Sequence, residues 1–400
     1  MLTLEEARAA ILERLAPAEA TETVDLEAAL GRYLARAPAA RVDNPPFDNS
    51  AMDGYALALA ELGPDRCLPV SGEAACGAPP ARLVPGTAMR IFTGAPMPGG
   101  ADTIAIQEEV QREGDRACFP PDLQPGRHLR RRGEDFRAGQ ALYPAGHRLR
   151  PQDIALLSAA GCQPLEVYRV PRVLLLATGD ELVPPGRPLA PGRIYESNLA
   201  ATAGLLAELG IHPVERSTVA DDAGALRRRL QAAGDYDFII TSGGASVGDH
   251  DLVRQVFAEL GEIHFWRVRI KPGKPVAFGR LGPRGHFFAL PGNPVSSFVT
   301  FKLFVEPALV HWHHGRYRMP LLPARAAAGF RRRPGRREFL RARLRPAAFG
   351  LEAEPLPGQG SHQLAPLARC NAFIVVPEDQ AGFQAGDPVT VMPLAPWLDP

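Results

Sequence analysis

The chain has 400 residues, of which 46% are hydrophobic, so it is long enough for about two to four domains with buried cores. Its formal net charge of +1 does not favour binding to nucleic acid or to an anionic membrane. The five cysteines are widely spaced and lack a CxxC pair, which argues against a disulfide framework or structural zinc and favours a reduced, cytoplasmic protein.

The N-terminal part begins with two predicted helices. Thr3 to Glu6 forms a capping box before a helix that ends ahead of Pro17, and a second helix is predicted over 27–35. The run 43–55 contains several acids, asparagines and prolines, so it is predicted to be a structured loop. Within this loop, Asp53 beside Gly54 is assigned to a functional site.

The next part, 56–133, shows short extended runs separated by Gly and Pro, which predict a small β-rich domain. Thr93 follows a predicted strand, where it is either a phosphate or metal contact or an ordinary turn cap. Asp135 follows a glycine at the end of a basic run, and a rigid carboxylate there suits a divalent metal in an anion site. The arginines of that run are assigned to a solvated face.

From residue 173 onwards strands and helices alternate, which predicts a doubly wound parallel sheet of the α/β class. A helix over 151–160 precedes it. The predicted strands are 173–178, 214–219, 237–241, 265–270, 276–278 and 287–290, and the predicted helices are 197–209, 221–233, 251–260 and 295–310.

The segment Phe238 to Asp251, FIITSGGASVGDHD, combines a buried strand with a glycine-rich loop and the start of a helix. Few Cβ atoms in the loop would let backbone N–H groups approach a phosphate closely. The candidate residues in the loop are Ser242, Gly243, Gly244, Ser246 and Gly248. A tight turn without a ligand would have the same composition.

Further polar groups follow the ends of the predicted strands. They are Glu181, Asp221, Asp222, Asp249 and Asp251, with Lys271 and Lys274 in the loop KPGK and Pro291 and Pro294 in the loop LPGNP. Helix capping alone would account for Asp221 or Asp249. The convergence of a glycine loop, carboxylates for a hard cation and lysines for anions at one sheet edge favours a binding site.

The last part is predicted to be a small β-barrel or sandwich. The stretch 323–346 has nine arginines and one acid. We assign these arginines to solvent-facing strand positions, although a basic rim beside an anion site would use the same residues. The loop 358–362 is predicted to face a substrate, whereas His362 alone is weak support for catalysis.

Several common catalytic patterns do not occur in the sequence. There is no Walker lysine loop, no GxGxxG fingerprint and no nucleophilic cysteine with a placed histidine. Covalent catalysis and hydride transfer are therefore not favoured.

Nine motifs occur in the order typical of one family. They are PPFDNSAMDGYA, TGAPMPGGADTIAIQEE, RRRGEDF, LLLATGDELVPPG, GRIYESN, ITSGGASVGDHD, FWRVRIKPGKPVAFG, LPGNPVSSF and GQGSH. In these motifs the chain resembles the MoeA family, which includes the E domain of gephyrin, from about residue 2 to residue 394.

The resemblance implies a molybdopterin molybdenumtransferase, which converts adenylylated molybdopterin and molybdate, with Mg²⁺, into the molybdenum cofactor and AMP. It also implies an elongated four-domain homodimer with a site between the α/β domain of one subunit and the β domain of the other. The implied parts are an N-terminal domain (1–42 and 136–168), a β-rich domain (43–135), a molybdopterin-binding α/β domain (169–315) and a C-terminal β-barrel (320–396). The molybdopterin adenylyltransferase and acceptor molybdoenzymes are the implied protein partners.

The resemblance assigns roles residue by residue. The residues implied for catalysis are Asp53, Thr93, Asp135, Glu181, Asp221, Asp251, Lys271 and Lys274, and those implied for Mg²⁺ are Asp53, Glu181, Asp221 and Asp251. Those expected to bind the pterin substrate are Ser242, Gly243, Gly244, Ser246, Gly248, Arg267, Pro291, Pro294 and Ser361. Arg267 stands where the family motif has a lysine, and an arginine does not reproduce a point charge.

Three other functions are compatible with parts of the sequence. The adenylyltransferase resembles the α/β domain alone and has a GGTG loop, whereas this chain has GGASVG and three further domains. A gephyrin-like scaffold would not require Asp53, Glu181 and Asp251, which are all present. A generic phosphotransferase would hydrolyse ATP without a pterin.

Overall fold

The computed structural model describes residues 1–243, 252–348 and 350–394. The chain forms two compact units. One contains residues 1–22, 31–33 and 168–400, and the other contains residues 23–30 and 34–167. None of the described helices is both long enough and apolar enough to cross a membrane. The division of the chain into four domains stays a prediction.

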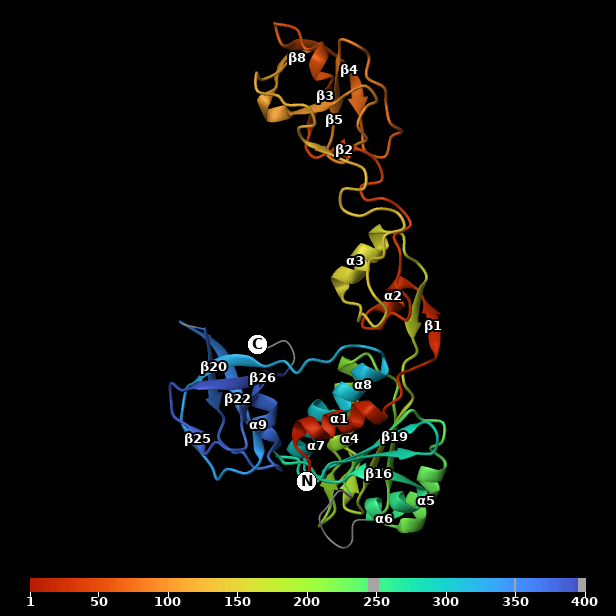
Figure 1. Ribbon diagram of the computed structural model, residues 1–400, viewed down its shortest axis with the longest axis vertical. Helices are drawn as coiled ribbons and strands as arrows, with labels where there is room; N and C mark the ends of the chain where they lie inside the picture. The colour runs from red at the N-terminus through yellow and green to blue at the C-terminus, as the bar shows by residue number, and fades with distance from the viewer. Residues whose placement is uncertain (244–251, 349, 395–400) are drawn as a thin grey trace. The chain divides into compact units, whose positions relative to one another are not determined.

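The larger unit contains a six-stranded sheet in the order β14-β11-β15-β19-β18-β16. Figure 1 labels β19 and β16 of this sheet. The first four strands are parallel, and β18 and β16 extend them as antiparallel strands. The strands are β11 (Val173–Thr178), β14 (Glu215–Val219), β15 (Phe238–Ser242), β16 (Gly261–Phe265), β18 (Ala277–Leu281) and β19 (Gly285–Leu290). This confirms the α/β class.

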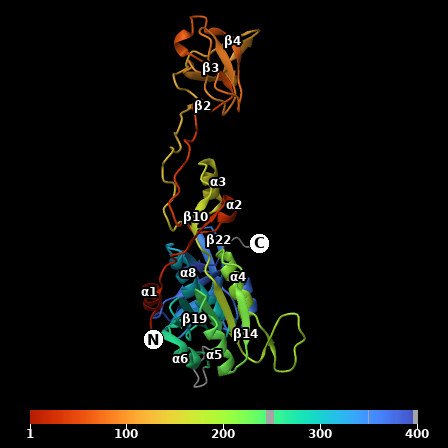
Figure 2. The same cartoon turned by 90° about the vertical axis from the view of Figure 1, so that its right-hand side faces the viewer.

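Helices cover both faces of this sheet, because alternate strand residues point to opposite sides. The helices are α1 (Leu4–Arg14), α4 (Asn198–Glu208), α5 (Ala223–Gln231), α6 (Leu252–Leu260), α7 (Pro294–Thr300), the π-helical η3 (Phe301–Val305) and α8 (Glu306–Trp312). Leu175 and Ile240 share a core with α1, α4, α7 and α8, whereas Leu174 and Ile239 pack with α5 and α6. Figures 1 and 2 show α5 and α6 lying side by side against the sheet.

The strand predicted over 265–270 is wrong. The structure forms β16 over Gly261–Phe265 and a short separate strand, β17, at Ile270–Lys271. An apolar alternation does not show which sheet a strand joins, and β17 pairs with β22 of the C-terminal part and not with the α/β sheet. The predicted helix 27–35 is also too long, because Gly31 has a φ of +78° beyond α2 (Leu26–Ala29).

The C-terminal part is a closed five-stranded barrel in the order β22-β23-β20-β26-β24, with β24 pairing back to β22. Its elements are β20 (Leu322–Ala326), β22 (Arg337–Ala347), β23 (Gly350–Pro355), α9 (Leu364–Arg369), β24 (Ala372–Val376) and β26 (Pro388–Pro393), with a ribbon of β21 (Phe330–Arg331) and β25 (Gly382–Phe383). Phe339 and Phe373 of the barrel belong to the same core cluster as α7 and the α/β sheet. This shared core joins the barrel to the α/β part.

The sequence analysis assigned the arginines of the barrel to solvent-facing positions. The structure shows that some of them are buried. Arg341 on β22 is 1% exposed, and its Nη2 donates to Gly358 O at 2.7 Å. The Arg332 side chain is 4% exposed. A guanidinium can be buried where carbonyl oxygens accept its N–H groups, and a count of arginines along the sequence does not show such acceptors.

The smaller unit contains a six-stranded sheet in the order β6-β3-β5-β4-β8-β7. Its strands are β3 (Gly54–Leu57), β4 (Cys67–Ala74), β5 (Ala88–Ile91), β6 (Thr103–Ile106), β7 (Gln111–Glu113) and β8 (Arg116–Cys118). The unit also contains a two-stranded ribbon, two 3₁₀ turns and two helices. These are β2 (Asn49–Ser50) with β9 (Leu129–Arg130), η1 (Leu59–Glu61), η2 (Gln107–Glu109), α2 and α3 (Pro151–Ala159). The chain also has two short two-stranded sheets. One pairs β1 (Thr21–Val24) with β10 (Leu165–Tyr168), and the other pairs β12 (Leu182–Val183) with β13 (Ile194–Tyr195).

The expectation that the cysteines form no disulfide is wrong for one pair. Cys67 and Cys118 are joined by an S–S bond of 2.02 Å. They are directly opposite each other on the antiparallel strands β4 and β8, with Cα atoms 4.0 Å apart. A separation of 51 residues conceals this pairing in the sequence. Cys76, Cys162 and Cys370 are free thiols.

Asp153 is the centre of a buried polar cluster at the start of α3. Its side chain is 1% exposed. It accepts hydrogen bonds from Tyr143 Oη, His147 Nε2, and the backbone N, Nε and Nη2 of Arg150, at 2.8 to 3.1 Å. Burial raises the pKa of the carboxyl, but the hydrogen bonds led by Arg150 outweigh it and hold the pKa of Asp153 well below its usual range.

Replacing Asp153 with asparagine is expected to lower the free energy of unfolding by about 3 kcal/mol, because a buried cluster loses its charge. The folded pKa lies below the unfolded value, so the stabilisation is complete above about pH 4 and is lost as pH falls further. Urea unfolding at pH 7 and pH 3 measures both effects. Glu113→Gln, at an exposed site on β7, should change stability little, and equal loss in the two variants would contradict the role of Asp153.

Candidate functional site

The carboxyl ends of β11, β15 and β19 meet at one edge of the α/β sheet, and one side chain contacts both the end of β15 and the loop after β19. Asn198 Nδ2, at the start of α4, donates to Ser242 Oγ at 2.8 Å and to Gly292 O at 2.7 Å. Asn198 therefore holds the glycine loop beside the LPGNP loop. The sequence analysis missed this residue, although its place in the motif ESN at a helix start could have indicated it.

Gly243 occupies a conformation that suits only glycine. Its φ is +91°, and a Cβ there would lie 3.0 Å from Thr178 O. Across the crevice, a Cβ on Gly292 would lie 3.5 Å from the Gly243 Cα. The two backbones are thus close together at the strand ends, where open α/β sheets bind ligands. Gly244, Ser246, Gly248 and Asp251 lie outside the described residues.

Acidic residues gather at the same sheet edge. The N-cap of α5 is Asp222, whose Oδ1 accepts from Ala225 N at 2.7 Å, so helix capping does not account for Asp221. Burial raises the pKa of Asp221, and the negative charges of Glu181 and Asp180 raise it further. Crowded carboxylates of this kind favour a cation between them. Among the described residues, no group of three His, Cys, Asp or Glu is placed to hold a metal ion.

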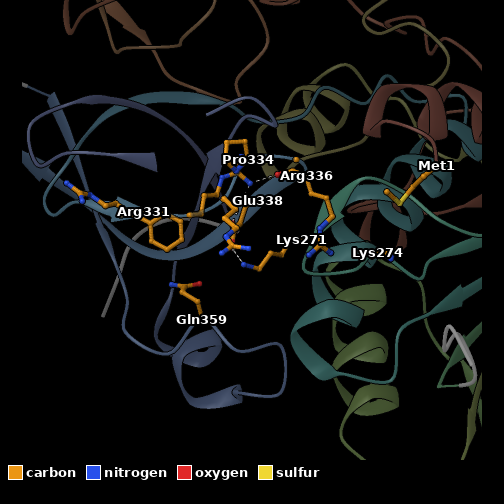
Figure 3. A pocket seen from close by; sticks show the side chains of 12 residues that line it. Met1, Lys271, Lys274, Arg331, Pro334, Arg336, Glu338 and Gln359 are labelled. Carbon is orange, nitrogen blue, oxygen red and sulfur yellow. Dashed lines mark hydrogen bonds and ion pairs between the residues drawn. The ribbon is translucent and has the colours of Figure 1, made fainter. Parts of the chain in front are cut away.

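Lys271 and Lys274 line a pocket of about 820 Å³ where the α/β part meets the barrel (Figure 3). The barrel side of the pocket is strongly basic. It contributes Arg331, Arg332, Arg333, Arg336, Glu338 and Gln359. The four arginines form the basic rim that the sequence analysis gave as the alternative to solvent-facing positions.

Lysine is rare in this chain. It occurs three times, at 271, 274 and 302, among 45 Lys and Arg residues. Two of the three lysines therefore lie in this pocket. An ammonium group is a compact charge with freely rotating donors, which a planar guanidinium does not replace.

The loop 358–362 adjoins the LPGNP loop. Ser361 O accepts from Val295 N at 3.1 Å, directly after Pro294. Gln359 holds β22 through its side chain, accepting from Arg341 N at 3.0 Å and donating to Arg341 O at 3.0 Å. Ser361 is thus next to the start of α7, where Pro294 is the first residue of the helix.

Arg267 does not join the two lysines. It lines a second hollow of about 340 Å³ together with Arg254, Phe265 and Trp266. Its backbone O accepts from Leu2 N at 3.3 Å.

In the smaller unit, two candidates are in direct contact. Thr93 donates from its backbone N at 2.7 Å and from Oγ1 at 2.8 Å to Asp53 Oδ1. These bonds, the backbone one first, lower the pKa of Asp53. Asp135 is held separately, because its Oδ2 accepts from Asn44 Nδ2 at 2.9 Å.

Replacing Thr93 with valine is expected to raise the pKa of Asp53, because the hydroxyl bond is lost, but to leave it below the usual range, because the backbone bond remains. Carboxyl carbon NMR titration measures the shift. Asp65, which Arg116 holds in the same unit, serves as the internal control and should titrate unchanged. An unchanged Asp53 pKa would contradict the structural explanation.

Comparison with known proteins covers almost the entire chain. Residues 2–161 match the MoeA N-terminal region (domain I and II), residues 174–311 a probable molybdopterin binding domain, and residues 323–394 the MoeA C-terminal region (domain IV). A molybdopterin molybdenumtransferase of Haemophilus influenzae is 36% identical over 399 residues, which cover 98% of each chain. Molybdopterin molybdenumtransferase 2 of Mycobacterium tuberculosis is 37% identical, covering 93% of this chain and 95% of its own.

Solved structures agree with these matches. A crystal structure of the molybdopterin biosynthesis MoeA protein from Pyrococcus horikoshii superimposes with a TM-score of 0.84 at 29% identity and covers 98% of this chain and 100% of its own. The order of elements, the α/β sheet with its glycine loop, the barrel and these matches lead to one conclusion: the chain belongs to the MoeA family.

Proposed function

We propose that this protein is a molybdopterin molybdenumtransferase, which converts adenylylated molybdopterin and molybdate into the molybdenum cofactor and AMP. The observation that carries the proposal is the basic pocket of Lys271 and Lys274, in a chain whose relatives of equal length have that name. Both substrates are anionic, and the pocket offers cations from the α/β part and from the barrel.

Each part of the site has a chemical task in this proposal. Lys271 and Lys274 bind molybdate oxygens as point charges. Backbone N–H groups of the loop that begins at Ser242 and Gly243 bind the phosphate of the adenylylated pterin. Pro291, Pro294 and Ser361 shape the wall beside this loop, and Arg267 binds an outer anionic group. Gly244, Ser246 and Gly248, which lie outside the described residues, are proposed to bind the same phosphate.

The proposed site also holds Mg²⁺. Glu181 and Asp221 fit a cation, because the pKa of Asp221 is raised by its acidic neighbours. Asp251 and Asp53 are the other proposed metal ligands. When bound, Mg²⁺ would polarise the phosphoanhydride as a Lewis acid.

The residues of the smaller unit belong to the same proposal. Asp53, oriented by Thr93, and Asp135 are proposed to act on the substrate. We propose a homodimer of four-domain subunits in which one subunit completes the site of the other. We further propose a cytoplasmic location, with the adenylyltransferase as donor of the pterin and molybdoenzymes as acceptors of the product.

Molybdate-dependent release of AMP from adenylylated molybdopterin tests the proposal. We expect release by the intact protein with Mg²⁺ and molybdate, and its loss in Asp53→Ala. Binding of adenylylated molybdopterin without AMP release under any condition would show a carrier or scaffold. Formation of adenylylated molybdopterin from ATP would identify an adenylyltransferase instead.

A further inference from the structure

The lining of the basic pocket includes one acidic side chain, Glu338. Among the described residues that line it, Glu338 is the only acid, against the cations of Lys271, Lys274 and four arginines. Glu338 lies on β22, directly opposite Lys271 on β17. It is 3% exposed, although carboxylates are rarely buried without a specific partner.

Glu338 is paired with a cation that a ligand would need. Lys271 Nζ lies 2.8 Å from Glu338 Oε1, and Figure 3 marks this ion pair with a dashed line. The Lys271 side chain is 48% exposed, so its ammonium faces both the carboxylate and the open pocket. On the other side, Arg332 Nη1 lies 3.5 Å from Glu338 Oε2, and this oxygen has no hydrogen-bond partner among the described residues.

Arg332 does not depend on Glu338 for its hydrogen bonds. Its guanidinium donates to the carbonyl oxygens of Gln380, Arg336 and Pro377. The hydrogen bonds of Arg332 are therefore made without Glu338, and the two side chains form a buried ion pair at 3.5 Å. The contact that Glu338 makes with the open pocket is thus its ion pair with Lys271.

We propose that Glu338 is an internal counter-ion that determines how tightly the pocket binds oxyanions. It holds the ammonium of Lys271 in place, and its negative charge weakens the binding of any dianion that shares this lysine. This inference rests on the proposed function, because it concerns the same anion pocket. Its physical basis is the repulsion between two negative charges on one cation, which water screens only in part at a buried site.

The test is direct binding of sodium molybdate and sodium sulfate to the full chain by calorimetry. Glu338→Gln keeps an oxygen that accepts from Lys271 but removes the charge. We expect it to lower the Kd for molybdate about tenfold and to lower the KM for molybdate in AMP release in parallel. A merely structural role would give the opposite result, since a damaged pocket binds more weakly.

Two control variants make the test specific. Glu378→Gln removes the same charge from a residue that pairs with Arg337 and does not line the pocket, so its Kd should equal that of the intact protein. Glu338→Asp keeps the negative charge and should therefore not show the tenfold fall in Kd. Thermal unfolding of each variant shows whether the fold is retained.

A double-mutant cycle with Lys271→Gln tests whether Glu338 acts through Lys271. The increase in molybdate affinity caused by Glu338→Gln should be smaller when Lys271 is already replaced. Unchanged or weaker molybdate binding by folded Glu338→Gln, when the intact protein binds, overturns this inference alone. Absence of oxyanion binding by both proteins overturns the anion pocket of the proposed function as well.

Discussion

Replacing Lys274 with glutamine is expected to lower kcat/KM for molybdate-dependent AMP release at least about 100-fold, the effect of removing one electrostatic contact to reacting anions. Within the described residues Lys274 has no carboxylate partner, whereas Lys271 shares its charge with Glu338. The positive charge of Lys274 is therefore less neutralised by the protein than that of Lys271. Lys271→Gln should show a smaller loss, on the order of tenfold, for that reason.

Two variants give this prediction its controls. Lys274→Arg keeps the charge but changes its shape, and it should recover only part of the activity if a compact ammonium is required. Arg369→Gln, at an exposed position at the end of α9, removes a positive charge outside the pocket and should leave kcat/KM within about twofold. Lys274→Gln with near-normal activity would show that the lysine is not part of the site.

Replacing Gly54 with alanine is expected to destabilise the smaller unit by about 3 kcal/mol or more. Gly54 lies between β5 and β6, and a Cβ there would lie 2.0 Å from Ala105 O. This oxygen belongs to the backbone of β6, so the strands would have to separate. Asp53 directly precedes Gly54, and the Thr93 contact should therefore be lost as well.

Gly99→Ala is the matched control for this prediction, because the nearest atom to its Cβ would be Ala81 O at 3.9 Å. Urea unfolding of both variants, followed by intrinsic fluorescence and circular dichroism, compares their stabilities. Equal stability of the two variants would contradict the close approach of β3 and β6. Because Asp53 belongs to the proposed site, AMP release should fall only in Gly54→Ala.

The α/β part was the most predictable from sequence, for a physical reason. Strands buried on both faces are continuous apolar runs, and the strand predicted over 173–178 was confirmed as β11. The strand predicted over 265–270 was wrong because β17 pairs with β22, whose paired residues lie 67 positions later (Ile270 with Arg337). Pairing over such distances depends on tertiary packing and leaves no local pattern.

The site could be predicted only in part. The glycine loop and the KPGK loop were predicted because glycine and proline mark turns by their backbone preferences and lysine marks a positive charge, all of which can be recognised from the local sequence. Glu338 and Asn198 were missed, since each acts through contacts with distant residues. Asp153 and the Cys67–Cys118 pair were missed for the same reason.

The scarcity of lysine gives the protein an unusual reactivity toward acylating reagents. Lys302 is paired with Glu306 and its side chain is 16% exposed, whereas Lys271 is 48% exposed in the pocket. Besides the α-amino group, succinimidyl esters should therefore react mainly at the pocket lysines. A fluorophore attached in this way would report on the pocket of an otherwise native chain, with no engineered cysteine.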